Sequence, residues 1–417
     1  MQLQGASERA QKRVLFISYN GMLDPLGQTQ VIPYLRELAR RGVQFTLLSF
    51  ERPTAFTGEG VRKRDELRQE LSEQGIEWHW LRYHQHPSVP ATIYDVMAGI
   101  RKAKKLIRRN RIGMIHARSH IPATIALALK RILGTKMIFD LRGLLAEEYV
   151  DTGHWRKGSI PYRLTKAAER RIFAETDAVV TLTERVWPII REWEGLRGRD
   201  VDHIVVPCCV DLSRFKFSEE DRTRRREELG LGDKFTIAYS GSIGSWYLTE
   251  EMADFFALFR RQRPNAHLIW LINGSHERVQ QLMKNRNVPA NHFSILSVPA
   301  RVVPSYLSAA DAALSFNKRC FSKIASSPTK YAEYLACGLP LIMNAGIGDS
   351  DALIDEWNAG VLLENFTEAE YTEAQTLIEK MVAQPDARQN ARAIAERLFN
   401  LQTVGVERYA ALYERVY

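Results

Sequence analysis

Two stretches of the chain repeat one pattern, in which a short apolar run leads into a glycine-containing loop and then into a helix-like segment. The first apolar run, VLFISY, covers Val14 to Tyr19, and the second begins at Phe235 with FTIAYSG. Short continuous apolar runs are typical of strands buried in a parallel sheet. A strand, a loop, an amphipathic helix and a further strand form the repeating unit of a doubly wound sheet. The pattern therefore predicts an α/β fold with such a sheet in each half of the chain.

The length of the chain agrees with two domains. A single hydrophobic core rarely serves more than about 250–300 residues, and this chain has 417. Its residues are 45% hydrophobic and 26% charged, which is the balance of a soluble globular protein. We therefore expect two domains of roughly 200 residues each.

The composition also predicts the compartment and the kind of partner. Four cysteines do not suggest a disulfide framework, and the opening MQLQGASERAQKR lacks the apolar run of a secretory signal. We expect a cytoplasmic protein without a membrane-spanning helix. The net charge of +9 indicates an anionic partner, such as nucleic acid, anionic lipid or a phosphorylated small molecule. Nucleic acid is disfavoured because the sequence has no zinc-finger spacing and no aromatic RNA-binding signature.

One helix-like segment carries an unusual density of positive charge. The segment from Ile93 to Arg111 combines an apolar stripe with a basic face. The stripe consists of Ile93, Val96, Met97, Ile100, Ala103 and Ile107, and the basic residues are Arg101, Lys102, Lys104, Lys105, Arg108, Arg109 and Arg111. Such a face is either solvated or rests on an anionic membrane, where each cation contributes about 1 kcal/mol. The sequence leaves both interpretations open.

Polar residues follow two consecutive strands of the first half. His116, Arg118, Ser119 and His120 follow one, and Asp140, Arg142, Glu147, Glu148 and His154 follow the next. A single histidine is more often a structural hydrogen-bonding group than a catalytic one. Two such clusters at neighbouring strand ends, however, predict a functional site at the carboxyl edge of the sheet.

In the second half, the stretch FSKIASSPTKYAEYLACGLPL predicts a helix that binds an anion. Ser326, Ser327 and Pro328 suit a helix start, and the free N–H groups of the first turn favour a negative charge. Lys330 adds a full charge, and Glu333, one turn further on, suits the vicinal hydroxyls of a ribose. An ordinary capped helix with solvated side chains fits the same spacing.

A glycine loop precedes this helix in the chain. Gly241, Ser242 and Gly244 follow the strand that begins at Phe235, and glycines let a backbone approach a phosphate closely. A plain tight turn between a strand and a helix fits the same residues.

The run Ser-Pro-Thr-Lys, followed by Glu-Tyr-Leu-Ala-x-Gly-x-Pro, resembles the donor-nucleotide helix of glycosyltransferase family 4, a retaining family with the GT-B fold. The resemblance extends over nearly the whole chain and is strongest from Phe235 to Gly360. It implies two Rossmann-like domains that face a central cleft, with the last helix crossing back to the first domain. The expected ranges are 1–207 for the acceptor-binding domain, 208–390 for the donor-binding domain and 391–417 for the crossing helix.

The resemblance also implies roles for individual residues. The expected donor-binding set is Gly241, Ser242, Gly244, Val298, Arg319, Ser327, Thr329, Lys330 and Glu333; the expected catalytic set is Arg118, His120, Arg142 and Lys330; and the acceptor side is expected to include Gly27, Gln28, His116 and Arg118. Glu333 would hold the ribose, and Lys330 and Arg142 would act on one diphosphate from opposite domains.

Three positions depart from the family pattern. Ala325 stands where the family has a glutamate that contacts the donor sugar. Ser242 and Tyr247 stand where many members have an arginine and a lysine that hold the diphosphate. Lys318, Arg319, Lys323 and Lys330 are expected to supply the missing charge.

The implied activity is sugar transfer from a UDP- or GDP-linked donor to a sugar or lipid-linked acceptor, with retention of configuration and without a metal or cofactor. A site on the inner face of the cell membrane, in cell-surface polysaccharide or glycolipid assembly, would agree with the basic segment. Two alternatives stay open, namely a sugar-nucleotide epimerase of the same fold and a catalytically silent nucleotide-sugar-binding protein.

Overall fold

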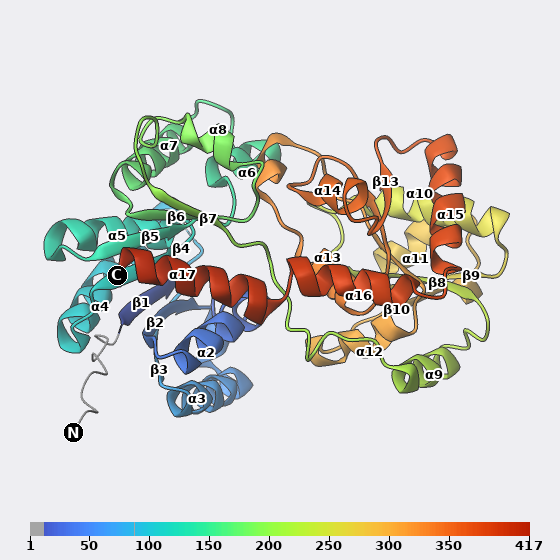
Figure 1. Ribbon diagram of the computed structural model, residues 1–417, viewed down its shortest axis with the longest axis horizontal. Coiled ribbons are helices and arrows are strands. Elements are labelled where there is room, and N and C mark those ends of the chain that lie inside the picture. The colour runs from blue at the N-terminus through green and yellow to red at the C-terminus, as the bar shows by residue number, and fades with distance from the viewer. Residues whose placement is uncertain (1–11, 87) are drawn as a thin grey trace, which may run out of the picture. The chain divides into compact units, whose positions relative to one another are not determined.

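The computed structural model describes residues 12–86 and 88–417, and the chain divides into two compact units (Figure 1). The first unit comprises the described residues up to Leu182 together with Val186–Val206 and Gly405–Tyr417. The second unit comprises Thr183–Arg185 and Pro207–Val404. The domain ranges 1–207, 208–390 and 391–417 stay predictions beside this division.

The first unit is built on a seven-stranded parallel sheet with the strand order β3-β2-β1-β4-β5-β6-β7. The strands are β1 Arg13–Ser18, β2 Gln44–Glu51, β3 Ile76–Arg82, β4 Met114–Arg118, β5 Lys136–Asp140, β6 Ala178–Thr181 and β7 Asp202–Val205. The order reverses between β1 and β4. Strands β1 and β4 are buried along almost their whole length, which explains their continuous apolar character.

Helices connect these strands. They are α1 Pro25–Gln30, α2 Ile32–Arg40, the 3-10 turn Pro53–Phe56, α3 Gly58–Glu73, α4 Ser88–Asn110, α5 His120–Leu133, α6 Leu145–Asp151, α7 Ile160–Glu175 and α8 Trp187–Arg191. Helix α5 packs beside both α4 and α7. Across the sequence, Tyr34 of α2 contacts Tyr409 of the C-terminal helix, with 5.6 Å between ring centroids.

The C-terminal helix α17, Glu407–Val416, belongs to the first unit, as the sequence predicted (Figure 1). The hydroxyl of Tyr413 lies 2.6 Å from Nδ1 of His116 on β4, and the hydroxyl of Tyr409 donates to Asp140 on β5 at 3.1 Å. The tail is not one continuous helix, because a π-helical turn at Leu401–Val406 separates α17 from the preceding helix.

The second unit is built on a six-stranded parallel sheet with the order β10-β9-β8-β11-β12-β13. Its strands are β8 Phe235–Gly241, β9 Ala266–Ile272, β10 Phe293–Leu296, β11 Ala312–Ser315, β12 Leu341–Asn344 and β13 Gly360–Leu363. The order reverses between β8 and β11. The two sheets confirm the predicted doubly wound α/β class in both halves.

Helices cover both faces of the second sheet. They are α9 Glu219–Glu228, α10 Thr249–Gln262, α11 His276–Asn285, α12 Val303–Ser308, α13 Thr329–Ala336, α14 Ser350–Asp355, α15 Glu368–Val382 and α16 Ala387–Leu398, with 3-10 turns at Ala290–His292, Ala300–Val302 and Phe321–Ala325. Successive strand residues alternate between two cores. Ala238 joins the core that contains α13 and α16, whereas Ile237 joins the core that contains α10 and α15.

The predicted serine cap of α13 is wrong. The helix begins at Thr329, its N-cap position is Pro328, and no side chain caps its first turn. The hydroxyl of Ser327 instead accepts the backbone N–H of Cys208 at 3.1 Å. The Ser327 hydroxyl, which could have capped the helix, is therefore engaged in a hydrogen bond with a residue far away in the sequence. The predicted helix end is confirmed, because Gly338 follows with φ of +73°.

The predicted apolar stripe of α4 is also partly wrong. Ala103 and Ile107 are buried, but Ile93 and Met97 are 60% and 61% exposed. In this part of α4 the buried residue is instead Asp95, whose carboxylate accepts a hydrogen bond from the hydroxyl of Tyr19 at 2.9 Å. In the two described ranges, no helix combines the length and the apolar character needed to cross a membrane.

We predict that Tyr413→Phe destabilises the protein by about 1–3 kcal/mol, because the ring nitrogen of His116 is left buried without its partner. Tyr94→Phe is the matched control, since Tyr94 is 62% exposed. Urea unfolding of both variants measures the effect. Equal stability of Tyr413→Phe and the parent would contradict the role assigned to this contact.

Candidate functional site

Each sheet has one point where its strand order reverses, and ligands of doubly wound sheets bind outside the carboxyl ends of the strands there. In the second unit this point lies between β8 and β11, and the glycine loop follows β8 directly. In the first unit it lies between β1 and β4, and Arg118 is the last residue of β4. The predicted site residues therefore fall at the two expected places.

Lys330 is the most constrained charged residue of the second unit. Its side chain is buried, and its Nζ donates to the hydroxyl of Tyr239 at 3.1 Å. The same Nζ lies 3.7 Å from the ring centroid of Tyr247. A Cβ at Gly241 would lie only 2.7 Å from this Nζ, so glycine leaves the room that Lys330 occupies. Helix α13 and the glycine loop thus meet at the lysine.

Hydrogen bonds from Tyr239 and from the backbone of Lys318 fix the glycine loop. Tyr239 accepts from Lys330 and donates its own proton to the carbonyl of Ser242. The N–H of Lys318, after β11, donates to the carbonyl of Trp246 at 2.8 Å. Gly241 and Gly244 have φ of +143° and +70°, which other residues rarely adopt. The loop is a fixed backbone surface beside a cation.

Lys330 and Glu333 are one helical turn apart, and burial shifts the pKa of each toward the neutral form. Desolvation lowers the pKa of Lys330 to about 7, although Glu333 opposes the shift. Desolvation also raises the pKa of Glu333 to about 7, although Arg214 and Lys330 oppose it. Within the described ranges, the Glu333 carboxylate makes no hydrogen bond or ion pair. Neither group has a partner that compensates its loss of water.

The other predicted donor-binding residues surround this pair or lie on the adjoining loops. Thr329 is the first residue of α13, Ser242 is exposed on the glycine loop, and Val298 packs against the α13 core. Arg319 is exposed and lies over Gly346, where a Cβ would be 2.8 Å from its Nε. Ser327 is committed to Cys208, as described above. Their roles in donor binding stay predictions.

The structure shows neighbours that the sequence reasoning missed. A guanidinium nitrogen of Arg278, on α11, lies 3.2 Å from where a Cβ of Gly244 would be. A second missed neighbour is Trp246, whose ring lies under Lys323, a residue that the sequence did name, with 3.8 Å between Nζ and the ring centroid. Arg278 lies in the first turn of the helix that follows β9, the strand next to β8. That position is the one sequence signal that could have indicated a role for Arg278.

The first unit holds a buried ionic cluster around Asp140. Nε2 of His116 lies 3.3 Å from Oδ2 of Asp140, and Arg142 lies 3.6 Å from Oδ1. Burial raises the pKa of Asp140, but Arg142, His116 and Arg118 outweigh burial and hold that pKa well below its ordinary value. Desolvation lowers the pKa of His116, so its ring is neutral at pH 7. His116 then donates from Nε2 and accepts from Tyr413 through Nδ1.

A structural ion pair with Glu147 or Glu148 is the alternative to a catalytic role for Arg142. Arg142 pairs with Asp140, and Glu147 pairs instead with Lys166 at 3.1 Å. Arg118 is buried at the end of β4, beside this cluster in the sheet. The structure therefore brings His116, Arg118 and Arg142 together around one carboxylate, and their catalytic and acceptor-side roles stay predictions.

The turn after Arg118 is conformationally unusual. Ser119 has φ of +78°, and its N–H donates to the carbonyl of Asp140 at 2.8 Å. Non-glycine residues in such conformations concentrate at functional sites. His120 starts α5 with its ring buried edge-on against Phe139, and desolvation lowers its pKa to about 3. A predicted acid–base role for His120 would have to operate with a neutral ring.

The loop after β1 is organised by a residue that the sequence did not single out. The carboxylate of Glu51, the last residue of β2, accepts the N–H of Met22 at 2.7 Å. A Cβ at Gly27 would lie 2.3 Å from the carbonyl oxygen of Gly21, so only glycine fits that approach. Gln28 donates to the carbonyl of Met22 at 2.6 Å. The expected acceptor-side residues Gly27 and Gln28 thus shape the loop backbone.

Cys208 and Cys209 are buried. Among residues 12–86 and 88–417, no cluster of three or more histidine, cysteine, aspartate or glutamate side chains could hold a metal ion.

The fold defined by these two sheets is GT-B. A solved glycosyltransferase from Rickettsia africae superposes with a TM-score of 0.71 at 14% identity, covering 98% of this chain and 99% of that one. The Anabaena protein HepE, solved in complex with UDP, gives 0.69 at 16% identity, covering 96% and 100%. The sucrose-phosphate synthase of Thermosynechococcus elongatus gives 0.69 at 14% identity, covering 97% and 98%. At these identities the likeness shows the fold alone.

Family models identify the chain more closely. The model described as a glycosyl transferase 4-like domain matches residues 28–209, and the model described as glycosyl transferases group 1 matches residues 221–397. The chain therefore belongs to the family 4 glycosyltransferases, as its motifs indicated. No curated protein sequence matches it significantly.

We predict that Lys330→Met stabilises the protein by about 1–4 kcal/mol at pH 8, because folding of the parent deprotonates Lys330 at that pH, a free-energy cost that methionine does not have. The gain should shrink as the pH rises toward 10. Over that range the unfolded parent still binds the lysine proton, whereas the folded parent has lost it, so parent stability rises with pH. Urea unfolding at several pH values measures this. Lys284→Met on exposed α11 surface is the control, and a pH-independent loss of stability in Lys330→Met would contradict the analysis.

Proposed function

We propose that the protein transfers a sugar from a nucleotide-sugar to an acceptor hydroxyl, with retention of configuration and without a bound metal. The observation that carries this proposal is the pair Lys330 and Glu333 on α13, with the glycine loop against the lysine. A cation, the open first turn of a helix and a carboxylate one turn further on match a diphosphate joined to a ribose. A ligand of this kind would compensate both desolvated groups at once.

The proposed chemistry is chiefly electrostatic. As the sugar leaves, negative charge grows on the terminal phosphate of the nucleotide. Lys330, the dipole of α13 and the N–H groups of the Gly241 loop supply positive charge in fixed positions, so little reorganisation is needed during the reaction. Lys330 would gain a proton when the diphosphate binds, because an adjacent anion raises the pKa of an amine. This charge is the reason we propose a metal-independent reaction.

We propose that the first unit binds the acceptor at the edge formed by β1 and β4. Arg118, Arg142 and the neutral His116 lie there around Asp140, beside the constrained turn at Ser119. Glu51 fixes the neighbouring loop, and with it Gly27. An acceptor hydroxyl needs positioning more than activation at such a site, and a rigid polar edge provides it.

Uridine is the base we propose first, with guanosine as the second. HepE has been solved with UDP and with UDP-glucose, and its fold covers almost all of this chain. Incubation of the purified protein with a panel of radiolabelled UDP- and GDP-sugars tests the function. Transfer or slow hydrolysis is the expected result. Interconversion of the sugar would identify an epimerase, and binding without turnover would identify a silent binder, so either result would contradict the proposal.

We predict that Glu333→Ala lowers nucleotide-sugar affinity at pH 8 by about 1.5–3 kcal/mol, because a charge-assisted hydrogen bond to the ribose is lost. Calorimetric titration measures the affinity. Glu373→Ala, which removes an exposed carboxylate of α15, is the control and should bind normally. Unchanged affinity in Glu333→Ala would remove the ribose assignment.

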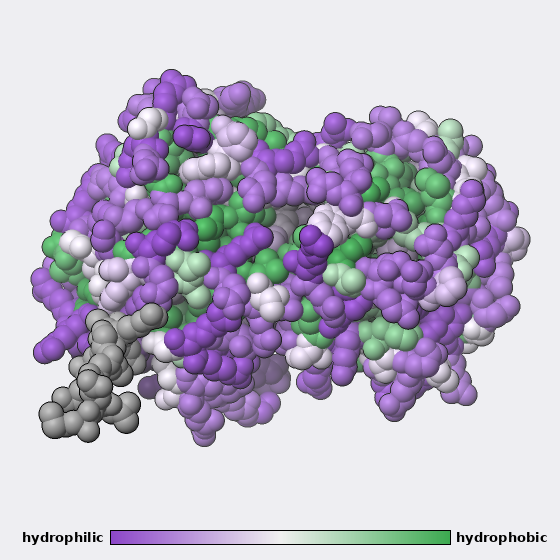
Figure 2. Space-filling view, viewed as in Figure 1, coloured by the Kyte–Doolittle hydropathy of each residue, from purple (hydrophilic) through white to green (hydrophobic). Residues whose placement is uncertain are grey.

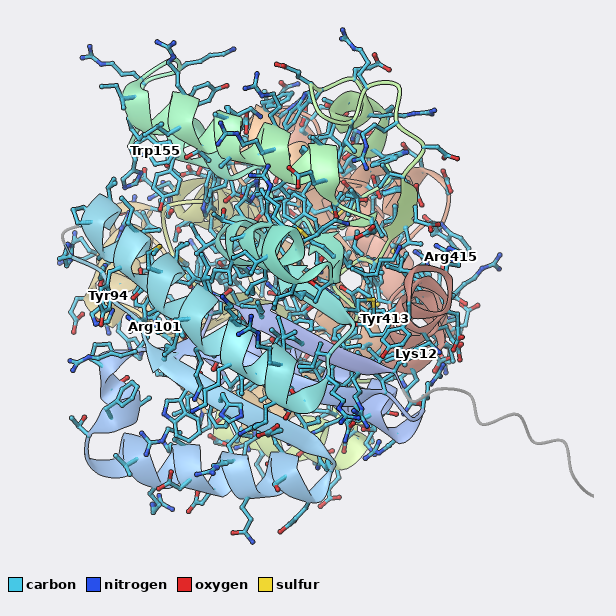
Figure 3. All side chains as sticks on the ribbon, turned by 90° about the vertical axis from the view of Figure 1, so that its left-hand side faces the viewer. Lys12, Tyr94, Arg101, Trp155, Tyr413 and Arg415 are labelled. Atoms are coloured by element: carbon cyan, nitrogen blue, oxygen red, sulfur yellow. The ribbon has the colours of Figure 1, made fainter. Side chains whose placement is uncertain are left out.

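We also propose that the enzyme works on a membrane surface at the cytoplasmic side, on a lipid-linked acceptor. The outer face of α4 exposes Val89, Ile93, Tyr94 and Met97 in its first half and Arg101, Lys105 and Arg108 in its second. Figure 3 shows Tyr94 and Arg101 one after the other along α4 on the outer side of the first unit. On the face drawn in Figure 2 the surface is mostly hydrophilic, with scattered apolar patches. Apolar residues beside cations suit an anionic bilayer.

Replacing Arg101, Lys105 and Arg108 with glutamine should weaken binding to anionic vesicles by about 3 kcal/mol, at about 1 kcal/mol per cation. Arg109 is left intact because it pairs with Glu77. A triple variant of Lys284, Lys380 and Arg301 to glutamine removes the same charge from exposed positions of the second unit. Co-sedimentation measures binding, and equal retention of the two triple variants would contradict the membrane proposal.

A further inference from the structure

A hollow lies in the second unit, at the opposite end of α13 from Thr329 and Lys330. Its volume is about 500 Å³, and its lining includes Gly338 and Pro340, which follow α13. Asp311, which precedes β11, also lines it. The hollow is therefore at the amino ends of β11 and β12, whereas the proposed donor site is at the carboxyl ends. Nothing in the proposed function uses it.

Positive charge exceeds negative charge around this hollow. Arg222, Arg226 and Arg388 share one carboxylate, that of Asp311, at 2.6, 3.7 and 3.7 Å. Lys216 is exposed on the rim and makes no ion pair in the described part of the chain. Arg392, which pairs with Glu396, also lines the hollow. Glu219 interacts with Arg388, and Asp386 is exposed between the lining residues Pro385 and Ala387. Among the lining residues themselves, four cations face the one carboxylate of Asp311.

Three arginines of the lining hold backbone carbonyls. Arg222 donates to the carbonyls of Ser308 and Ala310, where α12 ends, and Arg392 donates to the carbonyl of Ala336, where α13 ends. Arg388 also donates to the carbonyl of Ala310, at 2.6 Å. These arginines form a rigid wall of the hollow, and Lys216 is the lining cation that makes no ion pair in the described part of the chain.

Arg388 shows the effect of this excess. Its guanidinium lies over the ring of Phe217, 4.3 Å from the centroid. Burial, together with repulsion from Arg222, lowers the pKa of Arg388 to about 10. An anion in the hollow would offset both the loss of water and the repulsion from Arg222, and would raise the pKa of Arg388 again.

A helix start adds to the same charge. Helix α16 begins at Ala387, beside Arg388 in the lining, and no side chain caps its first turn. The N–H of Ala387 donates to the carbonyl of Gln384 at 3.2 Å, and the positive end of the dipole of this 12-residue helix lies at the hollow.

We propose that this hollow is a second anion site, which binds the phosphate group of a small phosphorylated metabolite. Arginine, lysine and a helix start are the groups that hold phosphates in proteins. The volume falls within the range of about 300–1,000 Å³ typical of small-molecule sites and exceeds what a bare phosphate fills. The site does not depend on the proposed sugar transfer.

Calorimetric titration of the full chain with inorganic phosphate and with a hexose 6-phosphate, at constant ionic strength in chloride, tests the proposal. Both probes should bind saturably, and should do so equally with and without UDP. Tighter binding of the hexose phosphate identifies a metabolite site. Binding of inorganic phosphate alone would overturn the metabolite assignment.

Lys216→Gln and Arg388→Gln should each weaken binding about tenfold, whereas Lys284→Gln should not. Lys216 is exposed, so its variant is expected to fold even if Arg388→Gln does not. Glu333→Ala should leave phosphate binding intact, which separates this site from the donor site. Failure of either probe to bind, or equal binding by the parent and Lys216→Gln, would overturn the proposal.

Discussion

The burial of the Lys330 ammonium group against Tyr239 and beneath Gly241 determines how the edge of the second sheet is arranged. Tyr239 cannot turn away, because it accepts from the lysine and donates to the glycine loop. Gly241 cannot carry a side chain, because a Cβ would meet Nζ. The depressed pKa of Lys330 and the raised pKa of Glu333 both follow from desolvation without a matching partner. Such an arrangement costs stability in the free protein and agrees with the diphosphate site proposed above.

The first unit shows the opposite electrostatic condition. Asp140 is as buried as Lys330, but Arg142, His116 and the hydroxyl of Tyr409 surround it. Cationic and hydrogen-bonding neighbours therefore favour its charged form, and its pKa is lowered. Because Tyr409 and Tyr413 come from α17, the C-terminal helix completes this cluster. We therefore regard the first unit as a stable polar frame and the second as the part poised for a charged ligand.

The sequence predicted the architecture well, since buried parallel strands and their glycine loops leave a direct signature in hydrophobic runs. It also named Gly241 and Lys330, but as separate features. Their contact depends on the alignment of β8 with β11 and on the packing of α13, which no local pattern contains. The serine cap of α13 failed for a similar reason, because Ser327 is bound to Cys208, far away in the chain. On α4, Asp95 is buried and Ile93 exposed because Tyr19 and His84 hold the aspartate. Glu51 and Arg278 were missed because their roles arise only when loops of neighbouring strands meet.

The central claim is that a nucleotide diphosphate binds Lys330 in its protonated form while Glu333 binds as a carboxylate. Calorimetry of nucleotide-sugar binding in buffers of different ionisation enthalpy measures the protons exchanged, and a nucleotide-sugar has no group of its own that titrates near pH 7. With both pKa values at about 7 in the free protein, the account predicts proton uptake by Lys330 at pH 8 and proton release by Glu333 at pH 6. Uptake should vanish in Lys330→Met. Binding without proton exchange at both pH values would contradict the account.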